Sequence, residues 1–436
     1  MASGVTPSHP APASLEGDLE ASLDGSLVAG VLSGTSADGI DVALCRIRLS
    51  GPGARPRVVG AEVVRCETVR MEPDLAARVR GVLEGGPLRL ADLATLDRDL
   101  GRAFGSAARE VARRAGAGPL ALVASHGQTV FHHDGDPALG KVTLQLGDGD
   151  HVAEAAGCAV ASDFRTRDCA AGGEGAPLVV LVDEVLFGAS PRPLAVLNLG
   201  GIANWTLLRE GEPPVGADAG PAGAVLDGLA RALLQAPMDE DGRAAAAGRV
   251  VDRVLERLLE HPFLARPWPK TTGLDTFGAG FLGELINGAR GVSPEDLLAT
   301  ATRFVARAAA DDLFLRGPEL ATCASLHVAV AGGGARNGTL IGMLEEELEA
   351  RARAGGARLA SFGASDSLGV PADFREGMAF AVLGARLAVG EASTHPAVTG
   401  ARAGRVLGKW SPGAQGTVSP WDGPSDLDGI RGREES

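Results

Sequence analysis

The chain has no tyrosine, only five cysteines and no long apolar run. The cysteines are odd in number and scattered without CxxC spacing, which argues against a disulfide framework or a zinc site and predicts reduced thiols in a cytoplasm. No apolar stretch approaches the roughly 20 residues that a membrane helix needs. Residues 1–25 lack the basic start and apolar centre of a signal peptide. We therefore expect a cytoplasmic protein with no membrane partner.

The chain also has fewer basic than acidic residues, with 41 Lys and Arg against 55 Asp and Glu, which gives a formal net charge of -14. This balance argues against nucleic acid or an anionic membrane surface as a general partner. The 436 residues suffice for two or three domains with a large core. The sequence thus fits a soluble enzyme.

Residues 28–46, VAGVLSGTSADGIDVALCR, predict a hairpin with an unusual tip. Glycines let the tip approach a ligand closely, and its hydroxyls suit phosphate oxygens. Asp38 and Asp41 would repel a phosphate unless a cation lay between them, which favours a metal-bound nucleotide with Asp38 as the candidate metal ligand. An ordinary Gly/Asp turn is the alternative. The candidate phosphate-binding residues are Gly34, Thr35, Ser36, Ala37, Asp38, Gly39, Ile40 and Asp41.

Residues 194–208, LAVLNLGGIANWTLL, repeat this organisation, with Gly200, Gly201 and Asn204 at or near the turn. Two such hairpins in two halves indicate a duplicated fold that grips phosphates from both sides. Further on, a predicted strand over 326–331 runs into three glycines, and bare backbone there would admit a flat ligand such as adenine. The nucleotide-binding candidates in this part are Gly332, Gly333, Gly334 and Asn337.

Four further segments offer polar candidates. A predicted strand over 120–124 ends in SHGQT, and strand ends are where α/β sheets bind ligands. The segment DFRTRDCAAGGEG contains Arg165 and Asp168, either as a substrate clamp or as an interdomain salt bridge over a glycine hinge. Asp218 lies between Gly and Pro residues in a predicted turn, which suits a general base but is also plain turn chemistry. The short loop PKTTG at 269–273 is a candidate neighbour of a phosphate or sugar.

Taken together, these segments resemble the anhydro-N-acetylmuramic acid kinase family, which belongs to the superfamily of actin, hexokinase and heat-shock ATPases. The resemblance runs in order from about residue 28 to 408, covering nearly all of the predicted ordered chain. It rests on ten motifs: GTSADGID, SHGQT, DFRTRD, GGEGAPLV, LNLGGIAN, DAGP, PKTTG, AGGGARN, REGMAFA and PAVTGA.

The resemblance implies an α/β fold of two lobes around a central nucleotide cleft, the duplicated ribonuclease H-like fold of actin-like ATPases. It implies ATP and Mg2+ as cofactors and a homodimer. In the family reaction, water opens the 1,6-anhydro ring of the sugar and the freed O6 takes the γ-phosphate, giving N-acetylmuramic acid 6-phosphate during cell-wall recycling. The catalytic carboxylate corresponds to Asp218. The substrate-binding candidates are His126, Thr129, Arg165, Asp168 and Glu376.

On this basis we expect a disordered leader over 1–26 and a flexible tail over 409–436. Lobe 1 would comprise 27–169 and 370–408, and lobe 2 would comprise 170–369. Gly223, Glu174 and Leu274 replace residues usual in the family (Asn, Gln and Arg), which puts sugar contacts of the second lobe in question. A kinase acting on another amino sugar and a non-catalytic nucleotide-binding protein remain alternatives.

Overall fold

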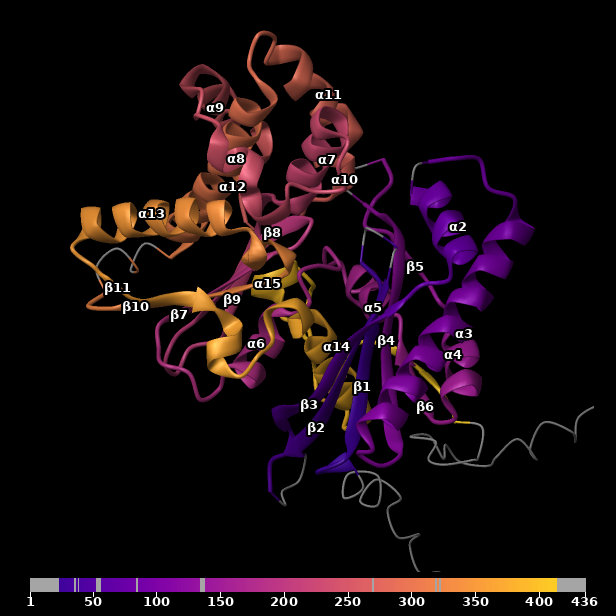
Figure 1. Ribbon diagram of the computed structural model, residues 1–436. Coiled ribbons are helices and arrows are strands. Elements are labelled where there is room, and N and C mark those ends of the chain that lie inside the picture. Colours follow the sequence, from indigo (N-terminus) through magenta and orange to yellow (C-terminus); the bar gives the residue numbers. More distant parts are fainter. Residues whose placement is uncertain are drawn as a thin grey trace, which may run out of the picture.

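The computed structural model describes residues 23–34, 37, 39–51, 56–83, 85–133, 138–268, 270–317, 320 and 323–413. Two sheets organise the described chain (Figure 1). The first contains β1 (Leu27–Leu32), β2 (Gly39–Leu49), β3 (Val58–Arg70), β4 (Leu120–His132), β5 (Thr143–Leu146), β6 (Ala159–Ser162) and β12 (Lys409–Ser411). The second contains β7 (Leu194–Leu199), β8 (Ile202–Leu208), β9 (Val215–Pro221), β10 (Leu326–Ala331) and β11 (Leu359–Ala364).

The two sheets have the same topology. In the first, the order β3-β2-β1-β4-β6 combines two antiparallel pairs with two parallel ones. In the second, β9-β8-β7-β10-β11 repeats that order and those directions. Each sheet therefore begins with a three-stranded meander and continues with two parallel strands. The duplicated ribonuclease H-like fold, in two lobes, is confirmed by this repetition.

Alternation along β1 explains why the first sheet is covered on both faces. Val28 and Leu32 belong to an apolar cluster with α14 (Arg375–Ala388), whereas Leu27, Ala29 and Val31 pack with α3 (Leu90–Ala115) on the opposite side. Helix α3 forms because its apolar residues recur at helical spacing, and Gly116 ends it in a left-handed conformation. The remaining helices of this part are α2 (Pro73–Leu83), α4 (Gly149–Ala156) and α5 (Phe164–Ala170).

The second sheet carries a largely helical layer centred on α12 (Pro294–Arg316). This helix starts at Ser293, whose hydroxyl accepts a hydrogen bond from the Asp296 amide at 3.1 Å. It contacts α7, α8, α9 and α13 as well as β8 and β9. The α-helices of this layer are α7 (Gly223–Leu234), α8 (Arg243–Ala247), α9 (Asp252–Leu259), α10 (Leu274–Phe277), α11 (Ala279–Gly288) and α13 (Gly338–Gly355). Short 3-10 turns are η1 (Glu240–Gly242), η2 (Pro262–Ala265), η4 (Gly333–Arg336), η5 (Ser365–Leu368) and η6 (Ala372–Phe374).

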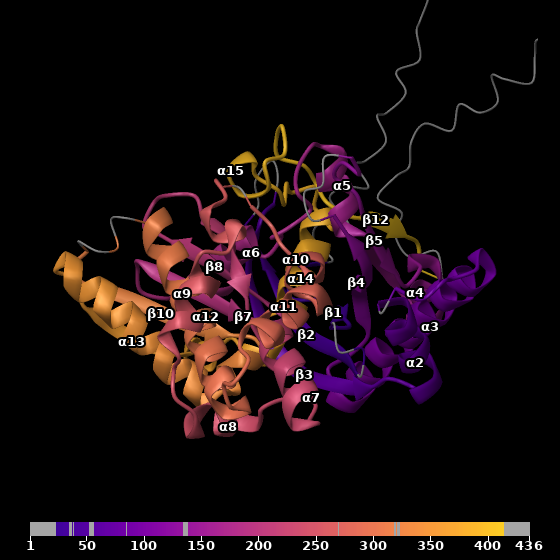
Figure 2. The ribbon, with the colours of Figure 1, turned by 90° about the horizontal axis from the view of Figure 1, so that it is seen from above.

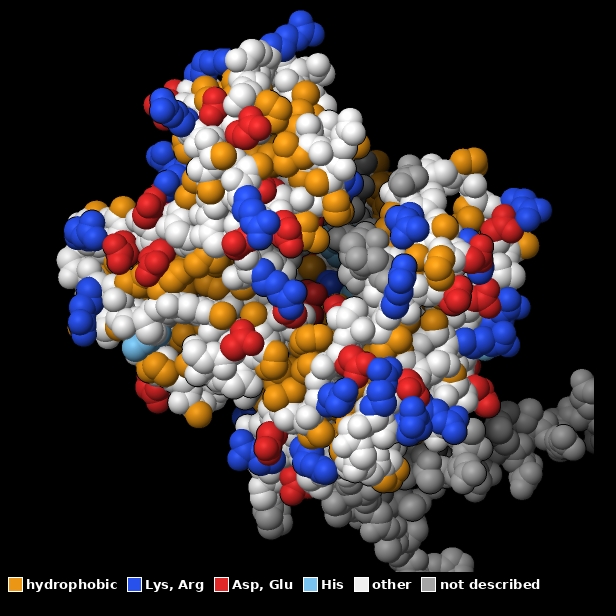
Figure 3. Space-filling model, in the orientation of Figure 1, with side chains coloured by type: hydrophobic (Ala, Val, Ile, Leu, Met, Phe, Trp, Pro, Cys, Tyr) orange, Lys and Arg blue, Asp and Glu red, His pale blue; other side chains and the backbone are white. Residues whose placement is uncertain are grey.

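Helices α6 (Val180–Leu186) and α14 join the two lobes (Figure 2). One apolar cluster contains Val28 of β1, Val182 of α6, Phe380 of α14 and Val196 of β7. A buried ion pair between Arg375 and Asp183 also links the two helices, with 2.8 Å from Nε to Oδ1. The lobes therefore share a core at this joint, while Figure 3 shows the surface hollowed between the helices α7, α10 and α11 of the second lobe and the helices α2 and α3 of the first.

Three predicted boundaries or conformations are wrong. SHGQT does not follow its strand, because antiparallel pairing with β5 continues β4 through it to His132. Asp218 does not occupy a turn but lies within β9, opposite Asn204 of β8. The predicted tail starts too early, since residues 409–411 form β12 against β6.

The predicted leader also ends too late. The Leu23 side chain is buried, and the Gly25 amide donates a hydrogen bond to the Ile47 carbonyl at 2.8 Å. Residues 1–22 and 414–436 lie outside the described chain. The short helix α15 (Pro396–Thr399) precedes β12 and contacts β9 of the second lobe. None of the helices in the described ranges is long and apolar enough to cross a membrane.

Candidate active site

The two hairpins occupy corresponding places in the duplicated sheets. In the first, Thr35, Ser36 and Asp38 lie outside the described residues, so the structure gives no position for the candidate metal ligand. Around them, the Ala37 amide donates to the Gly34 carbonyl at 3.2 Å, while Gly39, Ile40 and Asp41 already belong to β2. The Asp41 Oδ1 accepts a hydrogen bond from Thr68 Oγ1 at 2.6 Å, so this carboxylate is engaged by β3.

The second hairpin, between β7 and β8, is hydrogen-bonded to the start of α7. The amides of Gly223 and Ala222 donate to the Gly200 and Gly201 carbonyls, each at 2.9 Å. A Cβ atom at Gly223 would approach the Gly200 carbonyl oxygen to 3.0 Å. The unusual glycine at 223 thus lets the helix start press closely on the hairpin, and a larger residue would shift one or the other.

The three glycines after β10 have different roles. A Cβ at Gly332 or Gly334 would come within 2.8 Å and 2.6 Å, respectively, of Leu199 atoms, so packing against β7 requires these two glycines. Only Gly333 has nothing within 4 Å of an added Cβ. It is the one position of the three where bare backbone is available to a flat ligand. Asn337 caps α13, its Oδ1 accepting from the Leu340 amide at 2.9 Å.

Asp218 is buried in the second lobe, with 5% of its surface exposed. Its Oδ2 accepts hydrogen bonds from Thr271 Oγ1 at 2.8 Å and from the Thr272 amide at 3.0 Å. None of the residues in the described ranges donates to Oδ1. Burial raises the pKa of Asp218 to about 6, an effect that the two threonines, Arg165 and Lys270 oppose. A carboxylate so held is suited to accept a proton near neutral pH.

Arg165 lies on the other side of the site, on α5. Its Nε donates to His126 Nε2 at 2.9 Å and its Nη1 to the Gly175 carbonyl at 2.8 Å. Since His126 Nδ1 lies 3.0 Å from the Gly127 carbonyl, the imidazole carries its proton on Nδ1. Burial, and then the nearby Arg165, hold the pKa of His126 well below its usual range, so the ring is neutral.

Arg165 also interacts electrostatically with candidate site residues of both lobes. It forms no ion pair within 4 Å with a carboxylate of the described residues, yet the charges of Glu376 and then Asp218 act on it and oppose the lowering of its pKa by burial. Glu376 is half-buried in the first turn of α14 and accepts no hydrogen bond from the described part of the chain. The sequence candidates Asp218, Arg165 and Glu376 are therefore brought together.

Several buried polar atoms around these residues have no hydrogen-bond partner among the described residues. In the second lobe they include Asn204 Oδ1, on the strand next to Asp218, and Thr272 Oγ1. In the first lobe they include Ser125 Oγ and Gln128 Oε1 on β4. Thr129 Oγ1 accepts from Gln145 at 3.2 Å, which leaves its own proton available. Such unsatisfied groups are costly unless a polar ligand or water completes them.

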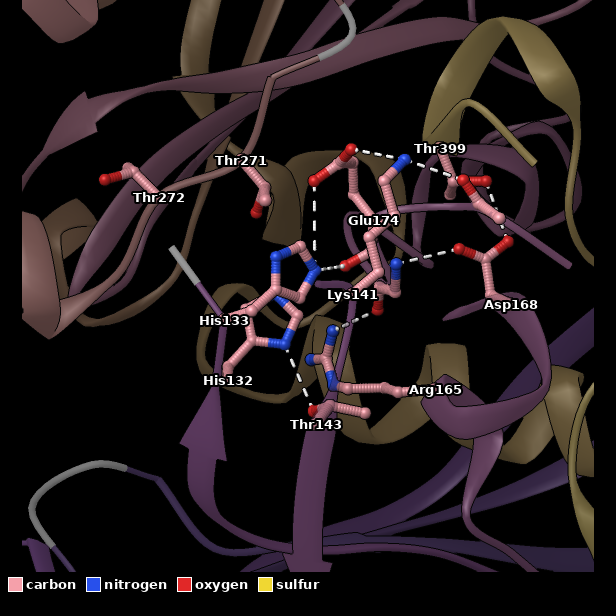
Figure 4. A network of polar contacts seen from close by, with 12 residues as sticks. His132, His133, Lys141, Thr143, Arg165, Asp168, Glu174, Thr271, Thr272 and Thr399 are labelled. Atoms are coloured by element: carbon pink, nitrogen blue, oxygen red, sulfur yellow. Dashed lines mark hydrogen bonds and ion pairs between the residues drawn. The ribbon is translucent and has the colours of Figure 1, made fainter. Parts of the chain in front are cut away.

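Asp168, by contrast, is fully occupied by the protein. It has no exposed surface, and its oxygens accept from the Gly175 amide at 2.8 Å, from Thr399 Oγ1 at 2.7 Å and from Thr394 Oγ1 (Figure 4). Among the described residues, Asp168 accepts hydrogen bonds but forms no ion pair within 4 Å, so the predicted interdomain salt bridge is not formed. The carboxylate ties the glycine segment to the start of the C-terminal region, and its contact with the sugar stays a prediction.

A sequence profile of the family described as anhydro-N-acetylmuramic acid kinase matches residues 26–413. The chain belongs to this family. It is 39% identical over 396 residues to the anhydro-N-acetylmuramic acid kinase of Streptomyces coelicolor, covering 89% of this chain and 94% of that protein. It is 40% identical over 396 residues to the kinase of the same name from Bordetella petrii, covering 90% and 97%.

Among solved structures, a ROK family glucokinase from Streptomyces griseus in complex with glucose and AMPPNP is similar at 14% identity and a TM-score of 0.35, covering 83% of this chain and all of that one. The membership in the kinase family rests on the profile and the relatives, which extend over nearly the whole described chain.

In this member of the anhydro-N-acetylmuramic acid kinase family, the unusual Glu174 forms a surface network (Figure 4). Lys141 Nζ lies 2.7 Å from Glu174 Oε1 and also donates to the Gly172 carbonyl at 2.6 Å. His133 Nε2 donates to the Glu174 backbone carbonyl at 3.0 Å. The lysine and glutamate side chains are 39% and 17% exposed, so solvent weakens their attraction.

We expect Glu174→Gln to lower the free energy of unfolding by less than about 1 kcal/mol, because a solvent-exposed ion pair contributes little and the backbone contact with His133 remains. The difference should shrink at high salt, since salt screens the charges. Urea unfolding at low and high ionic strength measures both. A larger, salt-independent loss would mean that the carboxylate has a buried role that this geometry does not provide.

The sequence did not identify the residues that hold Asp218. PKTTG was expected near a phosphate or sugar, but Thr271 and Thr272 contact the carboxylate itself. Lys270 was expected in the same loop near a phosphate or sugar, whereas its Nζ is buried 2.7 Å from Asp312 Oδ1. One signal was available: Asp312 interrupts an otherwise apolar face of α12, where Leu313 and three alanines at 308–310 are buried.

Proposed function

We propose that this chain is an ATP-dependent kinase that opens the 1,6-anhydro ring of anhydro-N-acetylmuramic acid with water and phosphorylates O6. The products are N-acetylmuramic acid 6-phosphate and ADP, in the recycling of peptidoglycan. The observation that carries the proposal, beyond family membership, is the buried Asp218 with Oδ1 unengaged by the described chain, across from Arg165 and Glu376. Together these groups supply one base and a cation within a polar site.

In this reaction Asp218 accepts the proton of the attacking water. The water oxygen bonds to the anomeric carbon as the bond from that carbon to O6 breaks, and O6 bonds to the γ-phosphorus as ADP leaves. Water is a poor nucleophile for an acetal, and a carboxylate fixed by Thr271 and Thr272 removes its proton without first having to be reoriented. Ring opening and phosphoryl transfer are therefore coupled at O6.

The first lobe supplies the sugar side of the site. Arg165 is a cation without a carboxylate partner within 4 Å in the described chain, so it can bind the carboxylate of the muramic acid while its charge lowers the pKa of Asp218. Thr129 and neutral His126 complete this side, with a free hydroxyl proton on Thr129 and an imidazole ring that packs 4.5 Å from Phe380. Asp168 would hold the segment behind them.

The nucleotide would lie between the two hairpins, with its phosphates at residues 34–41 and at Gly200 and Gly201, and its base over Gly333. Mg2+ bound with ATP supplies neutralisation of charge on the β- and γ-phosphates. In the described ranges, no group of three or more His, Cys, Asp or Glu side chains is placed to hold a metal ion. A kinase magnesium takes one or two carboxylates together with phosphate oxygens and waters. Asp38 stays the candidate ligand.

A homodimer and a cytoplasmic location stay predictions. Sedimentation of the purified protein tests the first, and fractionation of cells tests the second. Neither enters the mechanism above, because every residue invoked comes from one chain.

The substrate assignment is tested by presenting purified protein and ATP with anhydro-N-acetylmuramic acid, and in parallel with N-acetylglucosamine, N-acetylmannosamine and glucose. We expect ADP release only with the anhydro sugar, in one-to-one ratio with a phosphorylated, ring-opened product. Faster turnover of a sugar that lacks the anhydro bridge would assign the chain to a different substrate. ADP release without any sugar product would contradict the kinase assignment itself.

The pH dependence is set by the pKa of Asp218, which burial raises to about 6. The base works only when deprotonated, so kcat/KM should fall about tenfold per pH unit below that pKa and level off above it. Steady-state rates across the acidic range, with folding checked at each pH by circular dichroism, measure this limb. A rate that stays flat well below pH 6 in folded enzyme would show that Asp218 does not titrate in the reaction.

A further inference from the structure

A chain of buried contacts links Lys270, Asp312 and Trp205 near Asp218. Trp205 Nε1 donates to Asp312 Oδ2 at 2.8 Å, and Lys270 Nζ lies 2.7 Å from Asp312 Oδ1. The lysine and aspartate side chains are only 2% and 3% exposed. The lysine ammonium also lies 4.6 Å from the centroid of the Phe263 ring.

These contacts close on Asp218 from two directions. Lys270 directly precedes Thr271 and Thr272, the two residues that bind Asp218 Oδ2. Trp205 lies on β8, where its Cα partner across the strands is Ala217, the neighbour of Asp218 on β9. The strand pair fixes the backbone of Asp218, and Asp312 of α12 connects the adjacent strand to the loop that grips its carboxylate. The orientation of that carboxylate therefore depends on a closed ring of contacts.

Burying the ion pair between Lys270 and Asp312 is energetically unfavourable compared with burying apolar residues. Removing two charges from water costs several kcal/mol per ion, and apolar residues of similar volume would pack such a position as well or better. The residues 270–273, meanwhile, belong to no helix or strand. A short irregular segment has few backbone contacts to hold it, so a buried side-chain anchor at Lys270 directly constrains the two threonines after it.

We propose that Lys270 and Asp312 are positioning residues that hold the 270–272 segment so that Thr271 and Thr272 keep Asp218 aimed at the attacking water. This inference rests on the proposed role of Asp218 as the base. Neither residue touches substrate. They act through the two hydrogen bonds that Thr271 and Thr272 donate to Asp218 Oδ2.

The charges around the pair make the role measurable. Arg165 and Lys270 face Asp218 and both lower its pKa, against the larger effect of burial. On the far side, Arg316 Nε of α12 lies 3.9 Å from Asp312 Oδ1 and is the other cation near the pair. The hydrogen bonds from Thr271 and Thr272 also lower the pKa of Asp218, so a looser segment should raise that pKa as well as lower kcat.

The test compares Lys270→Met/Asp312→Asn with wild type. The double variant leaves no unpaired charge on either residue, and Asn still offers an oxygen to Trp205, so it should fold even where Lys270→Met alone does not. We expect kcat to fall about 10- to 100-fold, since small misplacements of a catalytic group cost rates of this order. KM for ATP and for the sugar should stay within about threefold, because neither ligand contact is changed. The acidic limb of kcat/KM should move to higher pH, because the double variant removes one charge of each sign while weaker hydrogen bonds from Thr271 and Thr272 raise the pKa of Asp218.

Arg303→Met is the matched control. Arg303 is also on α12 and forms ion pairs with Glu346 and Glu347 of α13, outside the ring around Asp218. It should keep wild-type kcat and an unmoved acidic limb. A folded double variant with unchanged kcat, or with its acidic limb unmoved, overturns the positioning role. If the positioning role fails in this way while Asp218→Asn is inactive in the same assays, the proposed function still stands. If Asp218→Asn is active, the assignment of Asp218 as the base fails.

Discussion

Asp218→Asn should lower kcat by about 10²- to 10⁴-fold, the usual cost of removing one positioned base. This corresponds to roughly 3 to 5 kcal/mol of transition-state stabilisation. The amide keeps the size of the carboxylate and can still accept from Thr271 and Thr272, but it cannot take a proton from water. Product formation and ADP release should fall together, because O6 becomes a nucleophile only as the anhydro bond breaks.

Binding of ATP should survive the change, since none of the hairpin residues is altered. Nucleotide titration by calorimetry measures this, and Asp311→Asn is the matched control: Asp311 is a half-exposed carboxylate of the same lobe, on α12. Near wild-type turnover by folded Asp218→Asn would remove the base role from Asp218. Glu376, whose charge also acts on Arg165 and which, unlike Asp168, accepts no hydrogen bond from the described chain, would then be the residue to replace.

The parts of the fold that the sequence predicted are those set by local pattern. Apolar segments on either side of glycine-containing turns predicted β1, β2, β7 and β8. The end of β4 was mistaken because its last residues owe their conformation to β5, a partner about ten residues further along the chain. A polar stretch such as SHGQT gives no local sign that another strand will pair with it.

Candidate site residues were predicted where the signal lies in the residue and its neighbours along the sequence. Contacts between residues far apart in the sequence were missed. Asp218 was singled out from its own neighbours in the sequence, but in a turn, because β8 that pairs with it could not be aligned by pattern alone. The groups that hold it come from Thr271 and Thr272, more than 50 residues further along. Asp168 was predicted to belong to a substrate clamp or an interdomain salt bridge, whereas folding engages it with Thr394 and Thr399. Charge and spacing do not reveal such distant contacts.

Gly30→Ala should destabilise the protein by about 3 kcal/mol, at the upper end of what overpacking costs. Gly30 is in the middle of β1, where α14 crosses the sheet, and an added Cβ would lie 1.8 Å from the Gly377 carbonyl oxygen and 2.8 Å from the Ala381 amide nitrogen. Both are backbone atoms of a helix, so no side chain can rotate away. The strand or the helix must move, and α14 carries Glu376 next to Gly377.

The shift should therefore be visible in the site as well as in stability. Urea unfolding measures the loss of stability, and KM for the sugar should rise because Glu376 moves with its helix. Gly81→Ala is the matched control: Gly81 is inside α2 with nothing within 4 Å of an added Cβ, so alanine there should stabilise by about 0.5 to 1 kcal/mol. If Gly30→Ala unfolded at the wild-type urea concentration, α14 could not lie as close to β1 as this packing requires, and the position of Glu376 opposite Arg165 would have to be reconsidered.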